Sequence, residues 1–168
     1  MHDAVIISTA RTPIGKAYRG AFNDTQAQAL AAHAITHAVE RAGIADDEIG
    51  DVVLGAALQQ GSTHMNVARQ AAIRAGLPTS VPGMTVDRQC SSGLMALSII
   101  SGQIRYGEIA TGVAGGVESI SLVQTSKMNI DRLVDPWIEA QRPDIYMTML
   151  ETAEIVAVRY GITRDAQD

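Results

Sequence analysis

The sequence has little cysteine, few aromatic side chains and no run of basic residues. Its 168 residues include one cysteine, Cys90, and 4% aromatic residues, and the formal net charge is -5. A single cysteine excludes an intramolecular disulfide and a metal site built from several cysteines. Because no stripe of lysine and arginine offsets the acidic balance, we expect no nucleic-acid partner.

The sequence also lacks a long apolar run. No stretch approaches the length that crosses a membrane. The N-terminus does not show the basic region followed by an apolar run that is typical of a signal peptide. We therefore expect no membrane span and a cytoplasmic location, with a core built largely from small side chains.

Apolar runs and helical patterns alternate along the chain. We expect strands at 4–8, 52–54, 84–87 and 109–115, and helices at 25–42, 66–75, 91–106 and 151–160. Strands that alternate with helices at this spacing predict an α/β fold with a largely parallel sheet. After about residue 120 the chain becomes more polar, which indicates a long excursion or a second subdomain.

The helix expected at 25–42 carries clear end signals. Thr25 and Gln28 fit a capping box, and Gly43 fits a C-terminal stop. Its apolar face is expected to contain Leu30, Ala31, Ala34, Ala38 and Ala42.

Cys90 lies where a strand leads directly into a helix. The unpaired N–H groups in the first turn of a helix favour negative charge, and therefore a thiolate. The same groups could hold the oxyanion of a thioester intermediate. The alternative is that Cys90 is a small buried hydrophobic residue, as many free cysteines are. Placement alone leaves both interpretations open.

Residues 86–94, which read Val-Asp-Arg-Gln-Cys-Ser-Ser-Gly-Leu, resemble the active-site segment of thiolases, the acyl-CoA C-acyltransferases. Stretches that match the same family in order and spacing are 8–15, 66–72, 114–121 and 152–154. On these motifs the chain is identified as similar to the N-terminal part of a thiolase.

The resemblance implies a fold and a division of the chain. Thiolases are αβαβα layered sandwiches made of two similar halves, with a CoA-binding loop domain inserted in the first half. By that likeness, residues 1–120 form the N-terminal βαβαβ half-domain. Residues 121–168 begin the inserted loop domain.

The resemblance also implies an activity. Cys90 would carry the acyl group as a thioester during thiolytic cleavage of 3-ketoacyl-CoA, or during the reverse Claisen condensation. CoA would be a co-substrate, and no tightly bound cofactor or metal is implied. The expected partners are acyl-CoA, CoA and further copies of the chain in a homodimer or homotetramer. Arg88–Gly93 looks more like degradative 3-ketoacyl-CoA thiolases than biosynthetic acetyl-CoA acetyltransferases.

The sequence departs from the family pattern in two respects. It contains no Gly-His-Pro segment and no second cysteine, so the 168 residues alone are expected to be inactive. Thr148-Met149-Leu150 stands where thiolases usually have His-Met-Gly. Met149 matches a position that borders the acyl pocket, and core packing is the alternative. The sequence assigns no residue to CoA binding.

Two other functions stay open at this point. A ketoacyl-synthase-like condensing enzyme would use the same fold and a cysteine nucleophile, with the acyl group on a carrier protein. A non-catalytic lipid carrier or scaffold would also account for the missing catalytic groups.

Overall fold

A parallel sheet of three strands lies at the centre of the first part of the chain. The strands are β1 (Asp51–Gly55), β2 (Gly83–Val86) and β3 (Gly112–Gly116), and their order is β2-β1-β3. In this computed structural model, which describes residues 3–168, the sheet belongs to a compact unit of residues 3–128. The predicted α/β fold with a parallel sheet is therefore confirmed.

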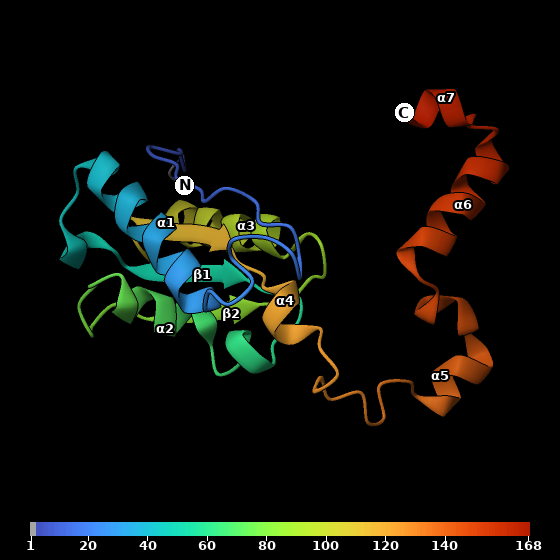
Figure 1. The fold of residues 1–168 in the computed structure, drawn as a ribbon. Helices are drawn as coiled ribbons and strands as arrows, with labels where there is room; N and C mark the ends of the chain where they lie inside the picture. The colour runs from blue at the N-terminus through green and yellow to red at the C-terminus, as the bar shows by residue number, and fades with distance from the viewer. Residues whose placement is uncertain (1–2) are drawn as a thin grey trace. The chain divides into compact units, whose positions relative to one another are not determined.

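Helices cover both faces of the sheet (Figure 1). α1 (Ala27–Ala42) and α2 (Val67–Arg74) lie on one face, and α3 (Ser92–Tyr106) lies on the other. Shorter elements of this unit are η1 (Asp46–Glu48), η2 (Gly61–Thr63) and α4 (Ile120–Val123).

The central strand β1 is buried on both of its faces. Val52 and Leu54 pack in the cluster formed with α1 and α2, whereas Val53 packs against Ala96 and Ile100 of α3. Alternate side chains of a strand point to opposite faces of a sheet. The sequence of a strand that lies between two helical layers is therefore an unbroken apolar run, as at 52–54.

The strand expected at 4–8 is not formed. Val5, Ile6 and Ile7 are 73%, 68% and 60% exposed, and no described residue forms a ladder with this segment. A strand exists only when its N–H and C=O groups pair with a neighbouring strand, so an apolar β-branched run is not sufficient. The segment lies over a cavity of about 1040 Å³ that α1, α3 and the edge strand β3 also line.

The expectations for α1 are partly wrong. The helix begins at Ala27, and its N-cap Gln26 makes no side-chain capping bond, so the predicted capping box at Thr25 is absent. Gly43, with φ 66°, ends the helix as expected. The fully buried residues are Ala27, Ala31, Ala32, Ile35 and Val39. Leu30, Ala34, Ala38 and Ala42 are only half-buried, and they line the cavity together with the buried Ala31, Ile35 and Val39.

The difference in the buried face has a simple cause. Two neighbouring apolar stripes run along α1, and helical spacing alone does not choose between them. The packing partner α2 covers the stripe that contains Ile35 and Val39.

The second unit, Asn129–Asp168, is built from helices. These are α5 (Pro136–Gln141), η3 (Pro143–Tyr146), α6 (Met149–Tyr160) and α7 (Arg164–Gln167), and none of them has a buried residue. Among the described residues, no helix is both long enough and apolar enough to cross a membrane.

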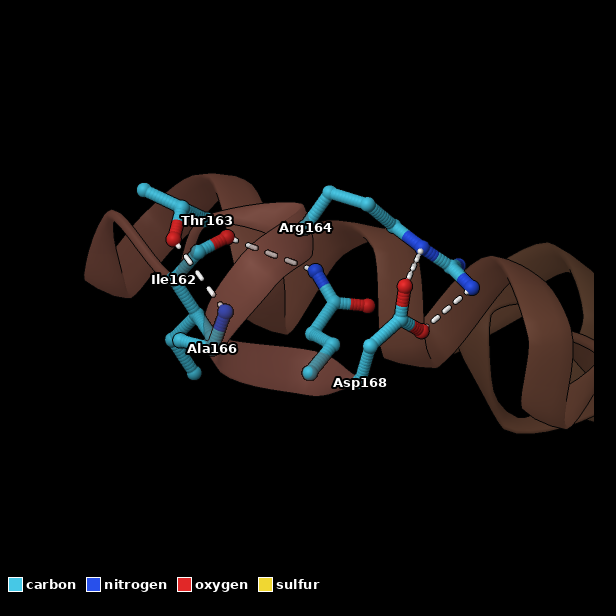
Figure 2. Close-up of polar contacts among 6 residues, drawn as sticks. Ile162, Thr163, Arg164, Ala166 and Asp168 are labelled. Atoms are coloured by element: carbon cyan, nitrogen blue, oxygen red, sulfur yellow. Dashed lines mark hydrogen bonds and ion pairs between the residues drawn. The ribbon is translucent and has the colours of Figure 1, made fainter.

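Thr163 is the N-cap of the short helix α7. Figure 2 shows Thr163 Oγ1 accepting a hydrogen bond from the N–H of Ala166, at 3.3 Å. Arg164 and Asp168 form an ion pair along the exposed face of the same turn. Local side-chain bonds therefore hold this turn, because no core residue packs on it.

A capping box begins α6. Thr148 Oγ1 accepts from the N–H of Glu151 at 3.3 Å, and the Glu151 carboxylate accepts from the Thr148 hydroxyl at 2.9 Å and from its N–H at 3.0 Å. The two bonds that the Glu151 carboxylate accepts lower the pKa of this carboxyl below its ordinary value. The bond from the Thr148 hydroxyl has the larger effect, and the bond from the Thr148 N–H has the smaller one.

We predict that Thr148→Ala raises the pKa of Glu151 toward its ordinary range, because the variant removes the hydroxyl bond to the carboxylate. A lowered pKa in the folded state stabilises the helix start above the pKa of the unfolded chain. That stabilisation is lost as the pH falls through the folded-state value. NMR titration of the Glu151 carboxyl carbon measures the shift. Thr152→Ala is the control, since the Thr152 hydroxyl bonds the Thr148 C=O instead; an equal pKa in both variants would contradict the assignment.

Candidate active site

The carboxyl ends of the three strands meet at one edge of the sheet. Gly55 lies in register with Val86 of β2 and with Gly116 of β3. The chain is tied together just beyond, where Ala56 N–H donates to the Val86 C=O and Val117 N–H donates to the Gly55 C=O, both at 3.0 Å. In open parallel α/β sheets, ligands bind outside this edge.

Glu118 joins two of the connections that leave this edge. Its carboxylate accepts a hydrogen bond of 2.7 Å from the N–H of Ala57. The segment after β3 is therefore held against the segment after β1 by a bond to an ionised acceptor, which is stronger than a neutral one. No local pattern in the sequence predicts this role for Glu118.

Cys90 lies at the same edge, between the end of β2 and the start of α3. It is exposed and directly precedes Ser91, the N-cap of α3. Cys90 is therefore not the small buried core residue that was the alternative interpretation. An exposed thiol at this edge is accessible to a substrate.

The backbone turns sharply just before Cys90. Gln89 has φ 47°, in the left-handed region that costs free energy for a residue with a side chain. The Asp87 carboxylate accepts from the Gln89 N–H at 2.7 Å. The N–H of Ser91 donates to the Arg88 C=O and the N–H of Ser92 donates to the Gln89 C=O, both at 3.1 Å. Among residues 3–168 the guanidinium of Arg88 forms no ion pair.

The first turn of α3 rests directly on the end of β1. A Cβ added to Gly55 would lie 2.3 Å from the carbonyl carbon of Ser92 and 2.5 Å from the nitrogen of Gly93. A Cβ on Gly116 would lie 3.4 Å from the Gly55 oxygen and from the Cα of Gly93. Bare backbone at the strand ends therefore sets how closely the helix start, and Cys90 with it, approaches the sheet.

Met149, the other candidate site residue, belongs to the second unit. It is the first residue of α6 and is 70% exposed, and Leu150 beside it is 82% exposed. The position at which the family has glycine is thus an ordinary helical residue here. Within the described residues, no group of three or more histidine, cysteine, aspartate or glutamate side chains could hold a metal ion.

A comparison of the sequence against known families agrees with the fold. The family described as "Thiolase, N-terminal domain" matches residues 4–168, nearly the whole chain. The chain belongs to the thiolase family.

Curated relatives carry two kinds of name. The chain is 38% identical to a 3-ketoacyl-CoA thiolase of Bacillus subtilis, over all of this chain and 42% of the relative. It is 42% identical to an acetyl-CoA acetyltransferase of Cupriavidus necator, over all of this chain and 45% of the relative. A peroxisomal 3-ketoacyl-CoA thiolase B of mouse is 38% identical over 99% of this chain and 39% of its own length. The chain thus spans about two fifths of the length of these relatives.

We predict that Gly55→Ala destabilises the first unit by about 3 kcal/mol or more, because the new methyl group overlaps backbone atoms that cannot move aside. Urea unfolding measures the loss. Gly102→Ala, in the middle of α3 with no heavy atom within 4 Å of the new Cβ, is the matched control. It is expected to stabilise the chain by about 0.5–1 kcal/mol through helix propensity. Equal stability of the two variants would rule out the close contact at Gly55.

Proposed function

We propose that this chain is the N-terminal part of an acyl-CoA C-acyltransferase that cleaves 3-ketoacyl-CoA with CoA, or runs the reverse condensation. One observation supports the proposal most. Cys90 is exposed at the carboxyl edge of the sheet, immediately before α3, in a chain that belongs to the thiolase family. CoA is a substrate in this proposal and not a bound cofactor.

The proposed cleavage has two steps. The Cys90 sulfur attacks the ketone carbon of 3-ketoacyl-CoA, and the bond between that carbon and the neighbouring CH₂ breaks. The electron pair leaves on the carbon of acetyl-CoA, which takes a proton, and the acyl group stays on Cys90 as a thioester. The thiolate of CoA then attacks this thioester, releases acyl-CoA and returns the Cys90 sulfur. In this proposal, backbone N–H groups near Cys90 stabilise the oxyanion that forms when the sulfur attacks.

A nucleophile needs a base to activate it, and the sequence lacks the groups that the family uses. By the family likeness, a second half supplies the histidine of a Gly-His-Pro segment, a second cysteine as acid and base, and an asparagine that holds water. We therefore propose that residues 1–168 alone do not turn over. In the same proposal, residues 1–120 form the half-domain and 121–168 begin the loop domain.

The substrate is proposed to be a 3-ketoacyl-CoA of degradative metabolism. The Arg88–Gly93 segment and the name of the Bacillus subtilis relative support this choice. Biosynthetic acetyl-CoA acetyltransferase is the second candidate, because the Cupriavidus necator relative bears that name at 42% identity. Comparing kcat/KM for acetoacetyl-CoA with that for longer 3-ketoacyl-CoA substrates separates the two. Turnover of carrier-protein thioesters only would instead indicate a ketoacyl-synthase-like enzyme.

Met149 is proposed to border the acyl pocket of the assembled enzyme. Its 70% exposure leaves it free to contact a substrate or another part of the protein. If it lines that pocket, Met149→Ala shifts the chain-length profile of kcat/KM toward longer acyl groups. An unchanged profile would assign Met149 to packing.

The proposed location is cytoplasmic, and the proposed assembly is a homodimer or homotetramer. Leu94 and Leu97 on α3 are 69% and 38% exposed, and a contiguous exposed apolar surface favours association. Light scattering of the full-length protein tests the assembly. Peroxisomal relatives make the peroxisome the alternative location that imaging would distinguish.

We predict that Cys90→Ala in the full-length protein abolishes formation of the acyl-enzyme, because the variant lacks the attacking sulfur. The acyl-enzyme is measured by exposing the protein to radiolabelled acetyl-CoA and quenching with acid. Mass analysis of the peptide that contains residue 90 then locates the label. Ser98→Ala, on the exposed side of α3, is the control and is expected to label as the unmodified protein does. Label retained in Cys90→Ala would refute the assignment, and a folded full-length protein that takes no label would favour a non-catalytic carrier or scaffold.

A further inference from the structure

The hydroxyl of Ser92 forms a clamp across the turn that precedes Cys90. Its Oγ accepts a hydrogen bond of 2.8 Å from the N–H of Arg88 and donates one of 2.5 Å to the C=O of Gln89. One side chain thus binds both ends of the two-residue segment that leads into the nucleophile. Ser92 is 5% exposed, so water competes little for these bonds.

The clamp holds a conformation that the backbone does not favour by itself. Gln89 lies at φ 47°, where a residue with a Cβ is strained, and such a residue persists only when its surroundings fix it. The Gln89 C=O accepts from both the hydroxyl and the N–H of Ser92, at 2.5 Å and 3.1 Å, and these two bonds orient the peptide unit that joins Gln89 to Cys90. The direction in which the Cys90 side chain leaves the backbone is therefore coupled to Ser92.

The position of Ser92 is itself fixed by the sheet. A Cβ on Gly55 would lie 2.6 Å from the Cβ of Ser92, so the serine lies against the bare end of β1. This contact prevents the first turn of α3 from moving toward the sheet. Gly55, Ser92 and Gln89 thus form a chain of contacts from the most buried strand to the residue before Cys90.

The neighbouring Ser91 lacks this arrangement. Its hydroxyl makes one bond, of 3.2 Å, to the C=O of Arg88, and its side chain is exposed. The two serines of the Ser-Ser-Gly segment therefore have different environments, which the sequence does not distinguish.

We propose that Ser92 is a positioning residue for the nucleophile, acting through the left-handed turn at Gln89 to aim the Cys90 sulfur at the acyl carbon. This inference rests on the proposed function of Cys90 and adds to it the residue that orients the sulfur. Ser92 touches no substrate in this proposal. Its effect is on the rate of acyl transfer to Cys90, and not on the affinity for acyl-CoA.

The test measures acylation of the full-length protein by radiolabelled acetyl-CoA, with rapid acid quenching across a range of concentrations. Ser92→Ala is expected to lower the maximal acylation rate constant by about 10- to 100-fold, because a misplacement of about 1 Å at a reacting atom has effects of that size. The half-saturating concentration should stay within about twofold. Ser98→Ala, the same change on the exposed side of α3, should alter neither quantity.

A second substitution separates aiming from packing. Glycine adopts positive φ without the penalty of a side chain, so adding Gln89→Gly to Ser92→Ala should restore part of the lost rate. A packing defect at the buried Ser92 would not respond to a change at the exposed Gln89. Unchanged acylation in Ser92→Ala, or no recovery in the double variant, would overturn the proposal.

Folding failure and failure of the parent hypothesis have their own readouts. If Ser92→Ala does not fold, Gln89→Val takes its place, since a β-branched residue resists the left-handed conformation while its side chain stays outside the core. The same loss of rate is expected, and an acylation rate equal to that of the unmodified protein would overturn the proposal.

A folded, unmodified protein without label at Cys90 overturns the proposed function and this inference together. An unchanged Ser92→Ala rate in a labelled protein overturns this inference alone.

Discussion

The contact between Gly55 and the first turn of α3 is the constraint on which the candidate site depends. β1 is buried between two helical layers, so its end is a fixed point in the first unit. Since Gly55 has no side chain, the backbone of Ser92 and Gly93 lies directly on that point. Cys90 is covalently two residues from this contact, and its position follows from it.

The chemistry of the site needs both rigidity and exposure, and the structure separates these demands. The sulfur is at an exposed edge, whereas the groups that position it lie beneath. Ser92 is buried, and Glu118 and the strand ends bind the adjoining connections together. A loop held in this way has few alternative conformations, which is what a preorganised nucleophile needs.

Much of this organisation could be predicted from the sequence because it depends on local patterns. The strand at 52–54 and the helix end at Gly43 are predicted correctly without any tertiary information. The Thr163 cap is local in the same way, since its partner is only three residues away. The placement of Cys90 between a strand and a helix is also predicted from local sequence patterns, and the flanking residues supplied the likeness to thiolases.

Other features were decided only by the tertiary structure, because they depend on partners far apart in the chain. Residues 4–8 have the composition of a strand, yet strand formation needs a neighbour that the pattern cannot specify. The buried stripe of α1 was chosen by α2. The different environments of Ser91 and Ser92 arise from the bare end of β1, some 36 residues earlier in the chain. The sequence by itself determined which residue is the nucleophile candidate, and only the folded contacts decided which serine bonds the turn before it.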